Sequence, residues 1–163
     1  MIKFTTSMGE ILIELDEEKA PVSCANFKQY VTDGHYDGTI FHRVINNFMI
    51  QGGGFMPDMM QKATREPIEN EAKNGLKNEI GSIAMARTMD PHSATAQFFI
   101  NVSNNNFLDY PGQDGWGYAV FGKVVDGMDV VKQMKGVETT HRAGHSDVPV
   151  EPIVIEKSEV VEE

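Results

Sequence analysis

Apolar and polar side chains alternate at both ends of the chain. Residues 2–6 and 10–15 alternate on either side of Met8-Gly9, which is typical of an antiparallel hairpin with one buried face. Residues 153–160 alternate again near the end of the chain. Between these segments lie further runs typical of strands, at residues 41–45, 48–51, 80–86, 97–102 and 118–125. The pattern therefore predicts a protein made mainly of short β-strands.

Two segments carry apolar residues at helical spacing instead. The first begins at Pro21, which suits the first turn of a helix, and ends before Gly34; its apolar face is formed by Cys24, Phe27, Tyr30 and Val31. The second covers 128–135 and ends at Gly136. Because strands and helices do not alternate, the order disfavours a parallel α/β fold. It favours a β-barrel or sandwich whose open ends are capped by the helices.

Composition and charge narrow the class of protein. With 163 residues, 40% of them hydrophobic and 23% charged, the chain has the length and composition of one globular domain. No apolar run reaches the roughly 18 residues of a membrane span, and the start of the chain lacks the pattern of a signal peptide. The lone Cys24 fits a reducing compartment, so we expect a cytoplasmic protein. A net charge of −10 makes nucleic acid an unfavourable partner.

The segment FHRVINNFMIQGGGF, residues 41–55, offers the first candidate chemistry. On a strand, Phe41 and Arg43 would face one side, and His42 and Val44 the other. After a turn, an adjacent strand returns with Phe48, Met49 and Gln51. An arginine beside such side chains is a fixed cation next to an apolar surface. Spacing alone nevertheless favours a solvated strand charge, since most arginines are exposed.

A second cluster follows in AMARTMDPHSATAQFFI, residues 84–100. It places Gln97 and Phe99 on one face of a strand and Phe98 on the other, and aromatic residues recur at Phe107 beside Leu108. Two aromatic residues in a short strand lie more often in a core than in a pocket.

Three other features do not predict cofactor chemistry. Gly52-Gly53-Gly54 lacks the Lys-Ser or Lys-Thr of a phosphate loop and opens no helix. His141 and His145 are four residues apart, but Gly144 favours a loop over a metal-binding helix. Cys24 has no CxxC partner and is expected to be a buried structural thiol. We expect no metal, nucleotide or covalent cofactor.

Taken together, FHRVINNFMIQGG, GSIAMA and QFFI resemble the cyclophilin family of peptidyl-prolyl cis/trans isomerases, most closely its compact bacterial cytoplasmic type. The resemblance covers nearly the whole chain, so residues 1–163 are expected to form a single isomerase domain. It implies a closed eight-stranded antiparallel β-barrel capped by two α-helices. It also implies acceleration of rotation about X-Pro bonds in unfolded or flexible polypeptides, which assists protein folding.

The resemblance assigns residues by their position in these motifs. Arg43 resembles the catalytic arginine, and His42 would be structural. The walls and rim of the proline pocket would be Phe48, Met49, Phe99, Leu108 and, on the rim, Phe107. Polar side chains near the substrate backbone would be Gln51 and Gln97, and Ala86 with Arg87 resembles the stretch whose main chain pairs with the peptide. Tyr118 stands where many eukaryotic relatives have His, and would keep the pocket but alter its selectivity.

The implied partners are proline-containing peptides and folding proteins. Phe107 stands where many eukaryotic relatives carry Trp, and losing the indole N–H implies only weak cyclosporin binding. Neither nucleic acid nor membrane is expected as a partner, and nothing resembles an interface stripe, so a monomer is expected. Two alternatives stay open: a non-catalytic Pro-peptide binding or chaperone module with the same pocket, and a hydrolase using His42, for which no Ser or Cys motif supplies a nucleophile.

Overall fold

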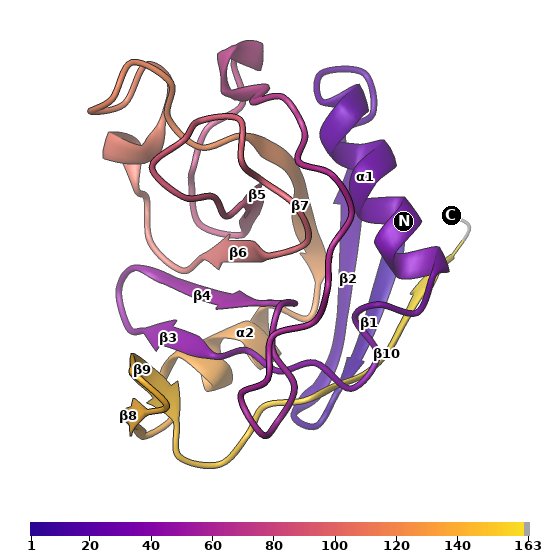
Figure 1. Ribbon diagram of the computed structural model, residues 1–163, viewed down its shortest axis with the longest axis vertical. Helices are drawn as coiled ribbons and strands as arrows, with labels where there is room; N and C mark the ends of the chain where they lie inside the picture. The colour runs from indigo at the N-terminus through magenta and orange to yellow at the C-terminus, as the bar shows by residue number, and fades with distance from the viewer. Residues whose placement is uncertain (162–163) are drawn as a thin grey trace.

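The computed structural model describes residues 1–161, and within that range eight antiparallel strands form one curled sheet (Figure 1). The strand order is β10-β1-β2-β7-β5-β6-β4-β3. The strands are β1 (Ile2–Thr6), β2 (Gly9–Leu15), β3 (Arg43–Ile45), β4 (Met49–Gly52), β5 (Ser82–Met85), β6 (Phe98–Asn101), β7 (Val120–Asp126) and β10 (Ile155–Val160). Every predicted strand segment overlaps one of them, which confirms the mainly β architecture.

The sheet is open between its edge strands β3 and β10, so the expected closed barrel is wrong and the fold is an open, curled half-barrel. Strands β3 and β10 do not pair with each other; the chain just before β3 instead contacts the start of β10 and the residues before it. Ile40 forms an isolated bridge with Val154, and the Phe41 N–H donates to the Ile153 oxygen at 3.0 Å. Ile155, the first residue of β10, also donates to the Thr39 oxygen at 2.8 Å and accepts from the Gly38 N–H at 2.7 Å, so these contacts lie before β3 and not along it.

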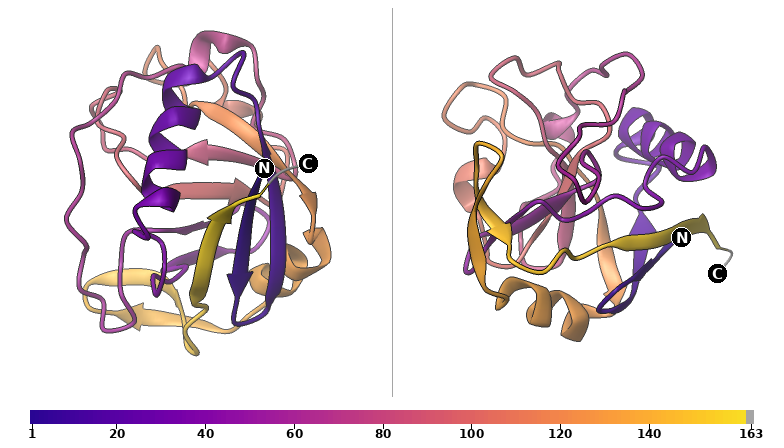
Figure 2. Two further views of the ribbon diagram at one scale, coloured as in Figure 1. Left: turned by 90° about the vertical axis from the view of Figure 1, so that its right-hand side faces the viewer. Right: turned by 60° about the horizontal axis from the view of Figure 1, so that its bottom comes forward.

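Two helices pack against different parts of the sheet. Helix α1 (Pro21–Thr32) contacts β10 and β7, and α2 (Met128–Lys135) contacts β2, β3 and β4 (Figure 2). Phe27 on α1 anchors the core, with aromatic ring centroids at 5.0 Å from Phe121 and 5.3 Å from Tyr36. Both predicted helices are confirmed, because their apolar spacing matches the faces that they bury. Among residues 1–161, neither has the length and apolarity that crossing a membrane requires.

A hairpin occupies residues for which a loop was predicted. Strands β8 (Thr139–Arg142) and β9 (His145–Pro149) pair with each other, and β9 packs on β3. At its turn, Ala143 and Gly144 both have positive φ, 49° and 81°. Two-residue hairpins use this geometry, usually with Asn-Gly or Gly-Gly. Alanine seldom adopts it, so the sequence carried no clear turn signal.

The polar segment between β4 and β5, which includes η1 (Ala72–Asn74), crosses to helix α1 and caps it. Ala20, at the N-cap position, provides no side-chain hydrogen bond. The Glu71 carboxylate instead accepts from the N–H groups of Ser23 at 2.6 Å and Val22 at 3.3 Å. These are two of the amide groups that a helix leaves unpaired at its start. Glu71, which is distant in sequence, therefore caps the N-terminus of α1 in place of the residue at the N-cap position.

Glu71→Ala is expected to destabilise the protein by about 1 kcal/mol, the usual effect of losing an N-cap acceptor. Urea unfolding followed by circular dichroism measures the change. Glu66→Ala, which removes an exposed carboxylate from the same segment, is the matched control and should leave the midpoint unchanged. Equal midpoints for the two variants would show that the remote cap contributes nothing.

Candidate functional site

A cavity of about 140 Å³ opens on the sheet face opposite the main core. It lies where β3, β4 and β6 meet the segment after β5, the 3-10 turn η2 (Asn106–Leu108) and the approach to β7. It is lined by Arg43, Phe48, Met49, Gln51, Ala86, Arg87, Phe99, Leu108 and Tyr118. Each of these is a residue that the family resemblance had assigned, and the fold brings them together from six segments of the chain.

Strand register aligns the site. Arg43 on β3 is the cross-strand partner of Gln51 on β4, and Gln51 is the partner of Phe99 on β6. Because side chains alternate along strands, the neighbouring row points the other way. That row, made by Val44, Ile50, Ile100 and Ile83, lies in the main core. The same three strands therefore build the core with one face and the cavity with the other.

The segment before β3 departs from the predicted alternation. Phe41 does not share a face with Arg43: it is fully buried, with its ring centroid 5.8 Å from that of Phe98, whereas Arg43 is exposed. The ladder begins only at Arg43, and Phe41 is turned by its main-chain bond to Ile153. His42 is buried against the Phe55 ring at 4.5 Å and does not line the cavity.

The Arg43 guanidinium is available to a ligand. Within the part of the chain that the structure describes, it takes part in none of the side-chain hydrogen bonds or ion pairs. Gln51 is held differently, because its Nε2 donates to Gln97 Oε1 at 2.9 Å. Gln97 lines an adjoining groove of about 180 Å³ rather than the cavity itself. The site thus combines a free cation with a fixed pair of amides at its edge.

Arg87 is a different kind of cation. Its side chain is only 3% exposed, pairs with Asp114 at 2.7 Å and lies over the Tyr118 ring, 4.3 Å from the centroid. It also donates to the Gly117 oxygen at 2.8 Å. The hydrogen bond from Arg87, with two from the main chain, lowers the pKa of Asp114 to about 2. The charge of Arg87 is therefore compensated by Asp114 within the protein, and the Arg87 guanidinium packs on the ring of Tyr118, which lines the cavity.

The other walls are apolar and mostly buried. Met49, Phe99 and Leu108 are 2%, 4% and 9% exposed, so each presents one surface to the cavity and packs with the rest. Phe107 is 53% exposed and stacks on Phe48, with ring centroids 5.8 Å apart, at the rim of the cavity. A shallow apolar pocket with a few polar groups at its mouth can hold a small ring and orient the bonds attached to it.

The glycine run after β4 has a packing explanation. A Cβ on Gly54 would lie 2.5 Å from the Gln97 side chain, and one on Gly53 would lie 2.7 Å from Tyr36. Gly53 also has a φ of +91°, which favours glycine. Gly54 therefore lets the chain pass close to the Gln97 amide, and Gly53 lets it pass close to the core ring of Tyr36.

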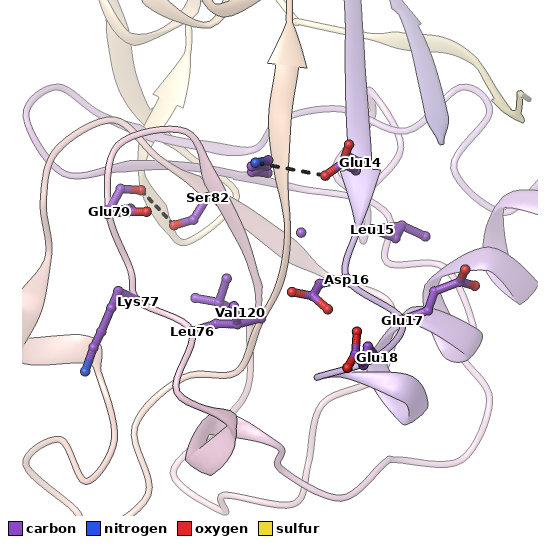
Figure 3. Close-up of a pocket in the computed structure, with 12 residues that line it drawn as sticks. Glu14, Leu15, Asp16, Glu17, Glu18, Leu76, Lys77, Glu79, Ser82 and Val120 are labelled. Carbon is purple, nitrogen blue, oxygen red and sulfur yellow. Dashed lines mark hydrogen bonds and ion pairs between the residues drawn. The ribbon is translucent and has the colours of Figure 1, made fainter. Parts of the chain in front are cut away.

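A larger cavity of about 490 Å³ lies away from these residues (Figure 3). It is bordered by the end of β2, the segment leading to α1 and the turn before β5, and includes the carboxylates of residues 14, 16, 17, 18 and 79. Among its lining residues, Glu14 on β2 forms an ion pair at 3.9 Å with Lys123, its cross-strand partner on β7. It contains none of the residues that the motifs assigned, and a mainly acidic lining does not fit an apolar ring.

Sequence reasoning did not single out Asp114, nor the buried asparagines Asn78, Asn101 and Asn105 beneath the cavity. Their partners are mostly distant in sequence, so spacing gives no signal for them. The run of three asparagines at residues 104–106, next to an apolar cluster, was the one local hint.

Comparisons with known proteins agree along the whole chain. Residues 1–160 match the family model described as cyclophilin type peptidyl-prolyl cis-trans isomerase/CLD. The chain is 59% identical over 162 residues to peptidyl-prolyl cis-trans isomerase cyp18 of Streptomyces antibioticus, covering 98% of each. It is 58% identical over 164 residues to peptidyl-prolyl cis-trans isomerase B of Escherichia coli K12, covering 99% of this chain and 100% of the relative. A Cryptosporidium parvum cyclophilin type peptidyl-prolyl cis-trans isomerase, crystallised in the presence of the dipeptide Ala-Pro, superposes with a TM-score of 0.84 at 27% identity, covering 99% of both chains.

Proposed function

The chain belongs to the cyclophilin family and is a peptidyl-prolyl cis-trans isomerase, and we propose that it catalyses this reaction in the cavity beside Arg43. The observation that carries the proposal is the position of Arg43. It places an unpaired guanidinium at the edge of an apolar pocket whose other walls are largely buried. A permanently charged donor next to a low-dielectric surface interacts strongly with a developing lone pair.

The reaction needs no bond to a nucleophile. Rotation about an X-Pro amide is opposed by a barrier of roughly 18–20 kcal/mol, which comes from resonance between the nitrogen lone pair and the carbonyl. Uncatalysed exchange takes tens of seconds or more. A turnover near 10³ per second therefore requires about 7 kcal/mol of barrier reduction. A site that stabilises the twisted amide more than either planar form supplies it.

The cavity provides two complementary contributions. The proline ring is held by the apolar walls Phe48, Met49, Phe99 and Leu108, with Phe107 at the rim and Tyr118 behind. The carbonyl before proline then rotates while the ring stays fixed. As resonance is lost, the prolyl nitrogen becomes pyramidal and gains a lone pair, to which Arg43 donates. The same fork of N–H groups reaches the carbonyl oxygen, so the twisted state gains hydrogen bonds that the planar states lack.

The substrate is an extended proline-containing segment of a flexible or folding polypeptide. The Cryptosporidium parvum relative, crystallised in the presence of Ala-Pro, supports binding of this chemistry. Gln51 and Gln97 offer amide groups to the peptide backbone beside the cavity, and Ala86 with Arg87 offers main-chain groups. Since the Ala86 N–H already donates to Gln97 O at 3.0 Å, its carbonyl oxygen is the group that would accept from the peptide.

Peptide NMR distinguishes catalysis from binding alone. With protein at about one hundredth of the peptide concentration, exchange peaks between the cis and trans forms of an Ala-Pro peptide are expected to grow, because a catalyst turns over many peptides. A Pro-peptide binding or chaperone module of the same shape would leave the exchange rate at its uncatalysed value. An exchange rate equal to the uncatalysed rate would contradict the proposal. Cleavage products would instead support the alternative of a hydrolase that uses His42.

Phe107→Trp is expected to tighten cyclosporin binding about tenfold relative to weak wild-type binding, because the indole adds one N–H donor at the rim. Isothermal titration calorimetry measures the dissociation constants. Phe107→Leu, which keeps an apolar side chain without a donor, is the control and should not bind more tightly than wild type. Equal affinity of the Trp variant and wild type would refute a donor deficit at the rim.

We also propose that residues 1–163 act as one domain, monomeric and cytoplasmic. The Cys24 thiol is fully buried and donates to the Phe121 oxygen at 3.2 Å, and burial raises its pKa to about 12. Such a thiol is inert, which suits a structural group in a reducing compartment. Sedimentation equilibrium at micromolar concentration is expected to give the monomer mass, and a dimer mass would refute the oligomeric part of this proposal.

A further inference from the structure

A chain of side-chain hydrogen bonds runs through the buried polar layer beneath the proline cavity. Asn105 Nδ2 donates to Asn101 Oδ1 at 2.7 Å, and Asn101 Nδ2 donates to Asn78 Oδ1 at 3.0 Å. Asn78 Nδ2 then donates to Asp109 Oδ1 at 3.1 Å. Asn78 and Asn101 are fully buried and Asn105 is 3% exposed. Burying amides costs free energy unless they are hydrogen-bonded, and here each of the three makes at least two side-chain hydrogen bonds.

This network of side-chain hydrogen bonds is attached directly to the main chain of two cavity walls, and to a third wall through the residue next to it. Asn105 Nδ2 also donates to the Phe48 oxygen at 2.8 Å, and Asp109, which accepts from Asn78, directly follows Leu108. At the other end, Asn78 Nδ2 donates to the Tyr118 oxygen at 3.3 Å. Phe48, Leu108 and Tyr118 come from the turn before β4, from η2 and from the approach to β7. The three amides, together with Asp109, thus connect these three segments.

Asp109 determines which atom of each amide in this hydrogen-bond network donates and which accepts. An ionised carboxylate only accepts, and Asp109 Oδ1 accepts from both the N–H and the Nδ2 of Asn78. Asn78 must therefore turn its oxygen toward Asn101, which must donate. The contact with Ser82 requires the same orientation of the Asn101 amide. The Ser82 hydroxyl donates to the Glu79 oxygen at 2.7 Å and so accepts from Asn101 Nδ2 at 2.9 Å. Reversing one amide would bring two acceptors or two donors face to face.

We propose that Asn78, Asn101 and Asn105 are positioning residues for the isomerisation, which hold the walls of the proline cavity at their working separation. The proposal rests on the assignment of catalysis to this cavity. Apolar packing between the walls is non-directional and tolerates sliding, whereas hydrogen bonds to their main-chain oxygens have fixed length and angle. Because the walls grip the ring in planar and twisted states alike, their displacement should weaken binding more than it slows the bound step.

Asn101→Leu interrupts the chain at its centre while roughly keeping side-chain volume. We expect KM for an Ala-Pro peptide to rise about tenfold, with kcat within about threefold of wild type. Thr39→Val is the matched control, because Thr39 is also fully buried and donates one short hydrogen bond, to the Tyr36 oxygen at 2.6 Å, outside the cavity. That variant should lose stability and keep its KM. A rise in KM that is equal in both variants, or absent in Asn101→Leu, would overturn the proposal.

A second pair of variants acts at the less buried end of the chain, in case Asn101→Leu does not fold. Asp109→Asn keeps an acceptor oxygen for Asn78 and should keep KM within about twofold, whereas Asp109→Ala removes it and should raise KM about tenfold. Equal KM values for these two variants would also overturn the proposal. Arg43→Ala in the same assay distinguishes failure of the proposed catalysis by Arg43 from failure of the positioning proposal. If it keeps wild-type kcat, the assignment of catalysis to Arg43 is wrong; if it loses kcat while Asn101→Leu keeps KM, only the positioning proposal is wrong.

Discussion

Arg43→Ala is expected to lower kcat/KM about 100- to 1000-fold, the usual effect of removing one donor aimed at a developing charge. The loss should fall on kcat, because the walls that grip proline are unchanged and Arg43 donates to a lone pair that exists only in the twisted state. Steady-state kinetics on an Ala-Pro peptide separate kcat from KM. A variant with wild-type kcat would remove Arg43 from the mechanism.

Two further substitutions sharpen that measurement. Arg43→Lys keeps the charge but loses the planar fork that serves the prolyl nitrogen and the carbonyl oxygen together, so it should recover little activity. Arg65→Ala removes an arginine outside the cavity, which pairs with Asp33 at 3.1 Å, and should have nearly wild-type kcat. If Arg65→Ala and Arg43→Ala were equally impaired, the loss would reflect overall charge and not the position of Arg43.

Stability is expected to fall as pH drops from about 6.5 toward 4 because of His42. Burial, reinforced by the charges of His145 and Arg43, lowers the pKa of His42 from 6.5 to about 4. In that window the unfolded chain binds a proton that the folded protein resists, so the free energy of unfolding rises with pH and is fully gained above 6.5. At about 1.4 kcal/mol per pKa unit, the loss approaches 3 kcal/mol at pH 4.

Urea unfolding at a series of pH values tests this expectation. His42→Leu should make the pH dependence between 4 and 6.5 clearly shallower, because His42 no longer titrates in either state; His35, whose pKa burial also lowers, contributes the remainder. His141→Ala, which removes an exposed histidine from β8, should leave the slope unchanged. Parallel curves for wild type and His42→Leu would show that His42 is protonated freely in the folded protein.

The elements with strong periodicity could be predicted from the sequence. Helix α2 has the predicted bounds of 128–135, and α1 starts at Pro21, because a buried face on a surface helix leaves a clear 3.6-residue pattern. The hairpin β8–β9 was missed because its turn uses Ala143, whose φ of 49° no turn rule assigns to alanine. The closed barrel was implied by the family resemblance and not by periodicity, and it is wrong because the edge strands β3 and β10 do not pair.

The site was anticipated residue by residue only through the family resemblance. Alternation alone put Phe41 on the face of Arg43, because it could not show that the ladder begins at residue 43. Side-chain contacts between residues distant in sequence could not be predicted from the sequence pattern either. Arg87 resembled a residue beside the peptide, but its compensation by Asp114, 27 positions later, is visible only in the fold. The same holds for Asn78 and Asn101, which are 23 positions apart and joined beneath the cavity.

The account rests on Arg43 lowering the barrier of an already bound prolyl bond, and exchange NMR on a saturated complex tests this most directly. With protein in excess over a labelled Ala-Pro peptide, cis–trans exchange of the bound peptide is expected to be fast with wild type. It should be about 100- to 1000-fold slower with Arg43→Ala at the same saturation. If the peptide bound to Arg43→Ala exchanges as fast as it does on wild type, the cavity holds proline but Arg43 does not catalyse its isomerisation.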